Sequence, residues 1–293
     1  MAQPAAGQRH DPGRAPRRVT VLCDNESADP HCGCEWGLAL AVDLGSAEEP
    51  REEDNGLWLW DTGQTDLFLK NATALGLDVG QARGLALSHG HFDHTGGLEA
   101  LVAAGFSGSI HAHPSCACAR FAEEPGGKPR RSIGPPTPLP AFIPAGPVTR
   151  LAPGLTLLTG IPRAPKNFQA VQGFSLDLEG ALPDPVPDDA FLVLDSRHGP
   201  VVILGCCHSG LANSLTCLRE RLGIRRVHAV LGGLHLFKAG LAALEETAQA
   251  IEEFAVQRLL AGHCTGPDRL AILKKRLPQC EVRPLAAGQT WEF

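Results

Sequence analysis

The sequence predicts an α/β fold, and two observations support this prediction. In the second half of the chain, short apolar segments alternate with segments whose apolar residues recur at helical spacing. Several apolar segments, including one at residues 85–87, end in loops that contain glycine and histidine. Sites in open α/β sheets lie outside the carboxyl ends of the strands. We therefore expect one α/β domain that gathers its polar loops at one edge.

Short apolar runs bounded by turn residues predict buried strands, and longer segments with helical periodicity predict helices. In the first half, the expected strands are residues 19–23, 38–44, 57–60, 85–87 and 108–113, and the expected helices are 66–77 and 98–104. In the second half, the expected strands are residues 155–159, 174–178, 191–194, 201–204, 227–231, 258–261 and 280–283, and the expected helices are 211–222, 241–254 and 268–277.

Residues 1–17 are rich in proline, glycine and arginine, which predicts a disordered tail before a single domain of residues 18–293. Residues 123–147 are a dense mixture of proline and glycine within that domain, and loops of this length are usually functional or mobile. This insert carries Lys128, Arg130 and Arg131. We expect either a positively charged lid over an anionic substrate or a solvated insert.

The composition is that of an ordinary soluble globular protein, with 43% hydrophobic and 20% charged residues. Because the net charge is −6, we expect no general attraction to nucleic acid or to an anionic membrane. No apolar run approaches the ~18 residues of a membrane span, and the first twenty residues lack the apolar core of a secretory signal. We therefore expect a cytoplasmic protein with a small-molecule partner, whose ten cysteines are thiols or metal ligands.

Residues 88–94, SHGHFDH, place four metal-binding side chains where an expected strand runs into an expected helix. Imidazole and carboxylate ligands suit zinc, and equally iron or manganese. Because His89 and His91 are two positions apart, an extended backbone points both to the same side. Asp93 and His94 follow on a turn, from which they can reach a second, adjacent ion. The motif therefore predicts a site for one or two divalent metal ions.

Three later strand ends add histidines to this set. His208 follows the strand at 201–204 in the motif GCCH, His235 follows the strand at 227–231 in GGLH, and His263 lies in GHCTG. Each motif is a weak signal alone, but their order along the chain makes the combination specific.

In this order, the motifs resemble those of the metallo-β-lactamase superfamily, whose HxHxDH signature matches residues 88–94. They are most similar to the branch that includes the 7,8-dihydropterin-6-methyl-4-(β-D-ribofuranosyl)aminobenzene 5′-phosphate synthase group. The similarity runs from about residue 19 to residue 293. The matching segments are residues 23–25, 35–38, 61–64, 88–98, 160–163, 205–210, 232–236 and 263–266.

The resemblance implies an αββα four-layer sandwich, in which two mixed sheets face each other and helices cover the outside. It also implies one or two divalent metal ions at one edge, with zinc expected and iron or manganese as alternatives. Asp61 is implied to orient the histidine loop. The implied ligands are His89, His91 and His208 for one ion, and Asp93, His94 and His263 for the other.

The chain departs from the family pattern at three positions. Most hydrolytic relatives carry a bridging aspartate after the strand that corresponds to residues 201–204, where this chain has Gly205 and Cys206. Cys206 is expected either to bridge the ions as a thiolate or to leave the site without a bridge. Trp36 stands where the synthase group usually has histidine, and Gly160 stands where it often has glutamate.

Three classes of function remain open on this sequence. The first is a metal-dependent enzyme that acts on an anionic, phosphorylated and pterin-related small molecule. For the synthase group, the reaction joins a dihydropterin to an aminobenzene ribosyl phosphate. The second is a metallo-hydrolase of an ester, lactone or phosphodiester, and the third is a non-enzymatic metal or redox sensor. For an enzyme, Asp93 and His235 are the candidate catalytic residues, and Arg163 and Lys166 are the candidate anion contacts.

Other histidines and cysteines have a structural alternative. His111 and His113 are expected to pack beside the metal loop without binding an ion. A separate zinc site of Cys32, Cys34, Cys116 and Cys118 is conceivable, but the C-x-C spacing is a weak signal, and packed thiols are the favoured expectation.

Overall fold

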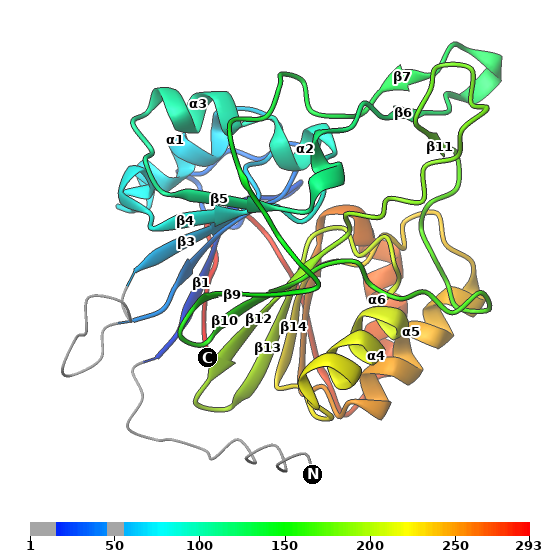
Figure 1. Cartoon of the computed structure of the whole chain (residues 1–293). Coiled ribbons are helices and arrows are strands. Elements are labelled where there is room, and N and C mark those ends of the chain that lie inside the picture. Colours follow the sequence, from blue (N-terminus) through cyan, green and yellow to red (C-terminus); the bar gives the residue numbers. More distant parts are fainter. Residues whose placement is uncertain (1–15, 46–55) are drawn as a thin grey trace, which may run out of the picture.

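The computed structural model describes residues 16–45 and 56–293, and its main feature is a pair of sheets packed face to face (Figure 1). Helices α1 (Leu67–Ala74) and α3 (Leu98–Ala103) cover the outer face of the first sheet. Helices α4 (Leu211–Leu222), α5 (Leu241–Glu253) and α6 (Pro267–Arg276) cover the outer face of the second. This order of layers confirms the expected αββα sandwich.

The first sheet is mixed and has the order β17-β1-β2-β3-β4-β5-β8. Strand β3 pairs in parallel with β4, and β4 with β5, whereas β1 pairs antiparallel with β2 and β17. The strands are β1 (Arg18–Cys23), β2 (Ala39–Asp43), β3 (Leu57–Trp60), β4 (Gly84–Ala86), β5 (Ser109–Ala112), β8 (Ile143–Pro144) and β17 (Thr290–Glu292).

The second sheet is also mixed and has the order β16-β15-β14-β13-β12-β10-β9. Strands β13 to β16 run parallel, so the loops after β13, β14 and β15 meet at one edge. The strands are β9 (Val148–Ala152), β10 (Leu155–Leu158), β12 (Phe191–Ser196), β13 (Gly199–Leu204), β14 (Ala229–Gly233), β15 (Arg258–Gly262) and β16 (Glu281–Pro284).

Three apolar clusters separate the four layers. One lies between the two sheets, and the other two lie beneath the helices on each side. Trp60 of β3 is fully buried between the sheets, and its indole N–H donates to the carbonyl oxygen of Leu204 in β13 at 3.0 Å. Burial of a large apolar side chain stabilises the fold by about 1.5–3 kcal/mol. Because Asp61 and Gly205 follow these two residues, the bond also aligns the strand ends that carry the polar loops.

Several expected segments differ from the structure. The strand expected at 174–178 is reduced to β11 (Phe174–Ser175), which pairs with β6 (Phe121–Ala122). The expected insert at 123–147 contributes β7 (Arg131–Ser132) to the same small sheet, which projects from the body in Figure 1. Its far end forms β8, which pairs with β5. The insert is therefore partly built into sheets, because its two ends find strand partners.

The ends of the described chain lie together. The expected tail comprises residues 1–17, of which residues 1–15 lie outside the described residues. Arg17 is buried, and its backbone exchanges two hydrogen bonds with Phe293, at 3.1 and 2.9 Å. The strand β17 was not expected from the sequence, since its partner β1 lies at the other end of the chain.

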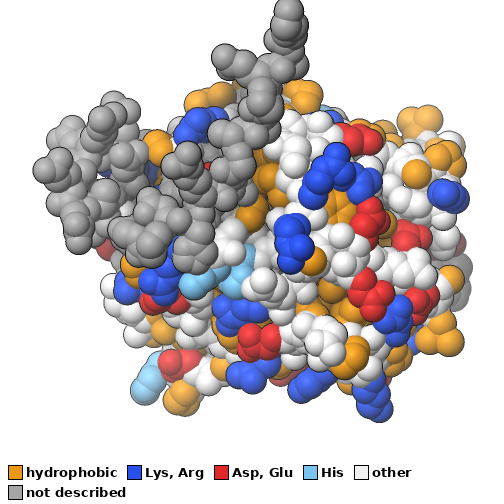
Figure 2. Space-filling view, turned by 90° about the horizontal axis from the view of Figure 1, so that it is seen from below, with side chains coloured by type: hydrophobic (Ala, Val, Ile, Leu, Met, Phe, Trp, Pro, Cys, Tyr) orange, Lys and Arg blue, Asp and Glu red, His pale blue; other side chains and the backbone are white. Residues whose placement is uncertain are grey.

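On the face in Figure 2, the described basic and acidic side chains are interspersed with apolar and uncharged ones. Among the described residues, every helix is too short or too polar to cross a membrane.

Candidate metal centre

A cleft of about 1100 Å³ opens at the edge where β4, β13, β14 and β15 end. The residues that line its floor come from the loops that follow these strands. They include His91 and Asp93 after β4, Cys206 after β13, His235 after β14 and Cys264 after β15. The fold therefore brings together loops that lie far apart in the sequence.

Three imidazoles converge on one point beside the cleft. The Nε2 atom of His89 lies 3.0 Å from Nδ1 of His91 and 3.2 Å from Nε2 of His208. All three rings are buried. Burial lowers the pKa of each of these histidines well below its usual value, and the neighbouring imidazoles lower it further. The rings are therefore neutral at pH 7, with lone pairs available for an ion.

Hydrogen bonds fix which nitrogen of these rings faces the centre. Nδ1 of His208 donates to the carbonyl oxygen of Ala170 at 2.6 Å, so its Nε2 carries the lone pair. Nδ1 of His89 lies 2.8 Å from Oγ of Ser88, which assigns the lone pair to its Nε2 as well. These assignments follow from the hydrogen-bond network. Outer contacts of this kind orient metal-binding histidines in proteins.

A second group of ligand atoms lies beside the first. Oδ2 of Asp93 lies 3.9 Å from Nε2 of His94 and 3.5 Å from Nε2 of His263. Burial opposes ionisation of Asp93, but His94 and His263 outweigh burial and hold the pKa of its carboxyl below the usual range. Nε2 of His263 is buried and has no hydrogen-bond partner among the described residues. Such an orphaned nitrogen, aimed at a carboxylate and a second imidazole, fits a divalent ion.

Cys206 lies between the two groups. Its sulfur is 3.2 Å from Nε2 of His94. Its sulfur also lies within 4.8 Å of ligand atoms of His89, His94, His208 and His235. A Cβ atom on Gly205 would come 2.2 Å from Oγ of Ser88, so glycine is required for β13 to approach the histidine loop this closely.

Asp61 supports the histidine loop from below. Its Oδ1 accepts the backbone N–H of Ser88, and its Oδ2 accepts the Ser88 hydroxyl and Nδ1 of His94, each at 2.7 Å. Because the carboxylate accepts from Nδ1 of His94, the lone pair of Nε2 faces the centre. Asp61 is fully buried and has a φ of 58°, a left-handed conformation that aspartate and asparagine tolerate better than most residues.

Replacing Asp61 by asparagine should weaken the second group of ligands while keeping the backbone conformation. The amide presents one acceptor in place of two, so a buried donor of Ser88 or His94 loses its partner. We expect the free energy of unfolding to fall by about 1–3 kcal/mol. Metal affinity at the group of His94 should fall about 10- to 100-fold. Urea unfolding and metal titration measure the two effects.

The exposed Asp66→Asn is the matched control for this experiment. Equal free energies of unfolding and equal metal affinities for both variants would contradict the role of Asp61.

Two aspartates that sequence reasoning left without a role also support the centre. Oδ2 of Asp188 accepts the backbone N–H of Gly90 at 2.8 Å, and its Oδ1 pairs with the fully buried Arg120 at 2.6 Å. Asp189 accepts the backbone N–H groups of His208 and Ser209, at 3.1 and 2.7 Å. The signal in the sequence was two adjacent acidic residues before a buried strand, which fits a turn equally well.

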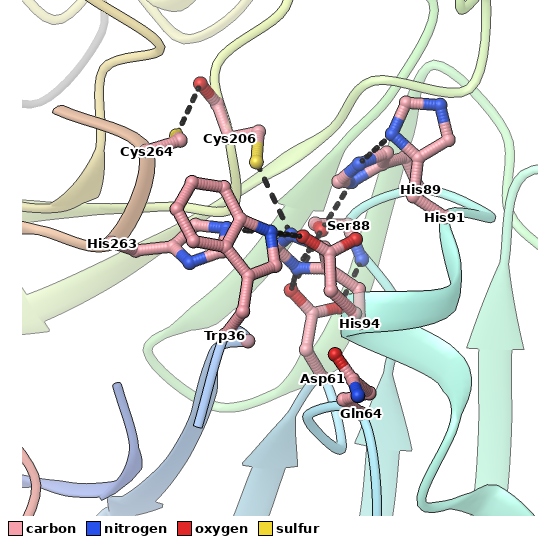
Figure 3. A network of polar contacts seen from close by, with 12 residues as sticks. Trp36, Asp61, Gln64, Ser88, His89, His91, His94, Cys206, His263 and Cys264 are labelled. Atoms are coloured by element: carbon pink, nitrogen blue, oxygen red, sulfur yellow. Dashed lines mark hydrogen bonds and ion pairs between the residues drawn. The ribbon is translucent and has the colours of Figure 1, made fainter. Parts of the chain in front are cut away.

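Trp36 lies over the second group of ligands and is half exposed in the cleft. Its indole N–H donates to Oδ2 of Asp93 at 2.8 Å, and its ring lies 5.3 Å from the ring of His263 (Figure 3). Trp36, which stands where the synthase group usually has histidine, thus holds the carboxylate of the candidate ligand Asp93.

The expected substrate contacts have different positions. Lys166 lines the cleft and is exposed. The guanidinium of Arg163 instead donates to Oγ of Ser209 at 3.0 Å and to the carbonyl oxygens of Pro185 and Val186. Because its nitrogens are used by the protein and it does not line the cleft, the expected anion contact at Arg163 is not supported. Its observed role is to fix two loops beside the centre.

His235 and the insert complete the cleft. The ring of His235 lies 4.5 Å from the ring of His208, and its Nδ1 is buried without a hydrogen-bond partner among the described residues. Arg131 lines the cleft and pairs with Glu124 at 2.7 Å, and Arg130 donates to the carbonyl oxygen of Gly173. The charge of the insert is therefore partly neutralised by the protein itself.

His111 and His113 have structural contacts. His111 bonds to Ser109 at 3.0 Å, and His113 caps the short helix at Pro114–Ala117, as expected for structural residues. Among the described residues, the groups able to hold a metal ion do not include the pairs at 32 and 34 or at 116 and 118. The conceivable zinc site of Cys32, Cys34, Cys116 and Cys118 is therefore not supported, because these thiols do not converge.

Residues 51–215 match the metallo-beta-lactamase superfamily, which is more than half of the chain, and the chain belongs to this superfamily. A curated relative is the 7,8-dihydropterin-6-methyl-4-(beta-D-ribofuranosyl)-aminobenzene-5'-phosphate synthase of Methanocaldococcus jannaschii. The two sequences are 29% identical over 247 residues, which cover 79% of this chain and 81% of the relative.

Solved structures show the same fold. Tm1679, described as a metal-dependent hydrolase of the beta-lactamase superfamily, has a TM-score of 0.77 and 27% identity, over 94% of this chain and 99% of that chain. The metallo-beta-lactamase fold protein YhfI from Bacillus subtilis has a TM-score of 0.53 and 14% identity, over 95% and 100% of the two chains.

Proposed function

We propose that this protein is a metal-dependent enzyme that acts on an anionic, phosphorylated small molecule. One observation carries the proposal: two groups of buried ligand atoms lie side by side, and His91 and Asp93 of these groups line an open cleft. His89, His91 and His208 would hold one ion, and Asp93, His94 and His263 would hold the other. The sulfur of Cys206 lies beside both groups.

The donor set supports zinc, with iron or manganese as alternatives. Imidazole, carboxylate and thiolate together suit a borderline divalent ion. When bound, such an ion supplies Lewis acidity toward a substrate oxygen and lowers the pKa of water. The protein contributes the neutral imidazoles of His89, His91 and His208, the buried carboxylate of Asp93 and an open cleft beside them.

Two side chains of the cleft are proposed to act on the substrate directly. Asp93 is held by the Trp36 indole through Oδ2, which fixes the direction of the carboxylate toward the centre. His235 lines the cleft beside His208, and its imidazole is proposed to hold a proton for a departing atom. A general acid must lie within hydrogen-bond reach of the atom that it protonates. Its place on the cleft floor supports this role for His235.

The cleft walls support an anion that carries a planar ring. Lys166 and Lys238 bring two cations to the walls. Trp36, Phe174 and Phe237 bring aromatic faces to the same walls, and flat rings stack favourably on such faces. A pterin-related phosphate combines both features, and the relative from Methanocaldococcus jannaschii is named for a product with a dihydropterin and an aminobenzene phosphate. A synthase reaction that joins a dihydropterin to an aminobenzene ribosyl phosphate is the first candidate.

Hydrolysis of an ester, lactone or phosphodiester is the second candidate. It is favoured by the likeness to Tm1679, which is described as a metal-dependent hydrolase and matches nearly the whole chain. We also infer a cytoplasmic location, which is supported by ten cysteines that are all free.

Turnover by metal-free and metal-reloaded protein tests the proposal. The substrates are a dihydropterin pyrophosphate with an aminobenzene ribosyl phosphate, an aryl phosphodiester, an aryl ester and a lactone. We expect turnover with at least one phosphorylated substrate, lost on chelation and restored by zinc, iron or manganese. Coupling without hydrolysis supports the synthase, and hydrolysis alone supports the second candidate. Activity that is unchanged by chelation would contradict both, and metal uptake without any turnover would favour a sensor.

The proposed anion contact predicts an effect of Lys166→Ala. Inorganic phosphate or a phosphorylated substrate should bind about tenfold more weakly, the lower end for a charge-assisted contact because this lysine is exposed. Lys70→Ala, an exposed lysine paired with Asp66 on α1, is the matched control. Inhibition by phosphate, titrated against both variants, measures the effect. Equal inhibition constants would exclude Lys166 from the anion site.

A further inference from the structure

A second sulfur atom lies beside Cys206 at the cleft floor. Cys264 belongs to the short helix η4 (His263–Thr265) that follows β15, whereas Cys206 follows β13. Both cysteines are buried, and both line the cleft. Figure 3 shows Cys264 beside Cys206 and on the same side of the site as His263. The two loops therefore bring a pair of thiols to the candidate metal centre.

The spacing of these atoms fits a single ion. Ligand atoms of Cys206, His263 and Cys264 all lie within 4.8 Å of one another. In a tetrahedral zinc site with bonds of about 2.3 Å to sulfur and 2.0–2.1 Å to nitrogen, ligand atoms lie about 3.5–3.8 Å apart. Small side-chain adjustments therefore bring the three atoms onto one ion.

The surrounding chain holds Cys264 in this position. The backbone N–H of His235 donates to the sulfur of Cys264 at 3.2 Å. A Cβ atom on Gly233 would come 2.6 Å from the same sulfur, so the end of β14 leaves room for it only because residue 233 is glycine. The sulfur lies 3.7 Å from the carbonyl oxygen of Cys206, which ties the two loops together.

We propose that Cys264 joins Cys206 and His263 as a sulfur ligand of one of the two ions, the one assigned to His263. This metal position would then select a thiophilic ion such as zinc over manganese. The inference rests on the proposed function, because it adds ligands to the same centre. Thiolates are soft ligands that favour zinc, whereas carboxylate, carbonyl and water ligands suit manganese. Two thiolates also neutralise the charge of a divalent ion within a buried site.

Cys207 provides a matched control. It is the next residue after Cys206 and is equally buried, but it packs in the apolar cluster beneath α4. Its sulfur lies 3.6 Å from Oγ of Ser214 on that helix. Substitution of Cys207 thus removes a neighbouring buried thiol that does not belong to the groups able to hold a metal ion.

Cobalt substitution of the full-length protein tests the inference without relying on activity. Sulfur-to-cobalt charge-transfer bands in the near ultraviolet report thiolate ligands directly. We expect these bands in the wild type and in Cys207→Ser, a weaker set in Cys264→Ser and in Cys206→Ser, and none in the double variant. Zinc affinity should fall about 10- to 100-fold in Cys264→Ser, with a smaller change for manganese.

X-ray absorption of the zinc-loaded wild type needs no variant, and it should show zinc–sulfur bonds at about 2.3 Å. A wild-type protein that takes up cobalt without sulfur bands would overturn the sulfur ligands but leave the metal-dependent function standing. Bands that are identical in wild type and a folded Cys264→Ser would overturn the role of Cys264. A wild type that takes up no divalent ion would overturn this inference and the proposed function together.

Discussion

Replacing His91 by alanine is expected to empty one metal position and to abolish turnover. His91 and His89 approach each other to 3.0 Å, and His208 completes the group. With one of three nitrogen ligands removed, the position keeps two neutral imidazoles, which hold a divalent ion poorly. Metal content of purified protein should fall by about one ion per chain, and turnover of any substrate found for the wild type should fall below detection.

His31→Ala is the control for this experiment. His31 is exposed and lies outside the groups of described residues that are able to hold a metal ion. This variant should keep its full metal content, so a loss in both variants would indicate a general effect of histidine removal. A His91→Ala protein that keeps its metal and its turnover would show that the assignment of the first position is wrong.

Replacing Asp188 by alanine is expected to destabilise the protein by about 3–5 kcal/mol, because it leaves a buried charge without its main partner. Arg120 is fully buried, and the Asp188 carboxylate lies 2.6 Å from it, whereas Asp184 is 3.4 Å away. Burial lowers the pKa of Arg120, but the two aspartates outweigh burial and raise it. Because a guanidinium is not deprotonated in proteins, the arginine stays charged after Asp188 is removed. Urea unfolding followed by tryptophan fluorescence measures the loss.

Two further variants separate charge burial from other causes. Asp66→Ala breaks an exposed ion pair with Lys70 and should cost less than about 1 kcal/mol. A double variant with Arg120→Met and Asp188→Leu removes both charges and should recover part of the stability lost in Asp188→Ala. If Asp188→Ala unfolds within about 1 kcal/mol of the wild type, the pair does not support the loop at Gly90.

The sequence by itself determined the parts of this protein whose signals are local. Strand and helix positions followed from short apolar runs and helical periodicity, as in α4, where the expected and observed bounds agree. The cluster of His89, His91, Asp93 and His94 could be recognised because all four lie within six positions and an extended strand followed by a turn aims them together.

The tertiary structure decided the parts that depend on contacts between distant residues. Asp188 meets Gly90 across 98 positions and Arg120 across 68, and no local pattern marks such pairs. The sequence showed Arg163 as a free cation near a site, but packing turned its guanidinium toward two backbone carbonyls. Cys264 became a candidate ligand only when parallel pairing of β14 and β15 placed it beside the loop after β13. Burial and direction of a side chain are set by the layers around it, so these roles are absent from any short stretch of sequence.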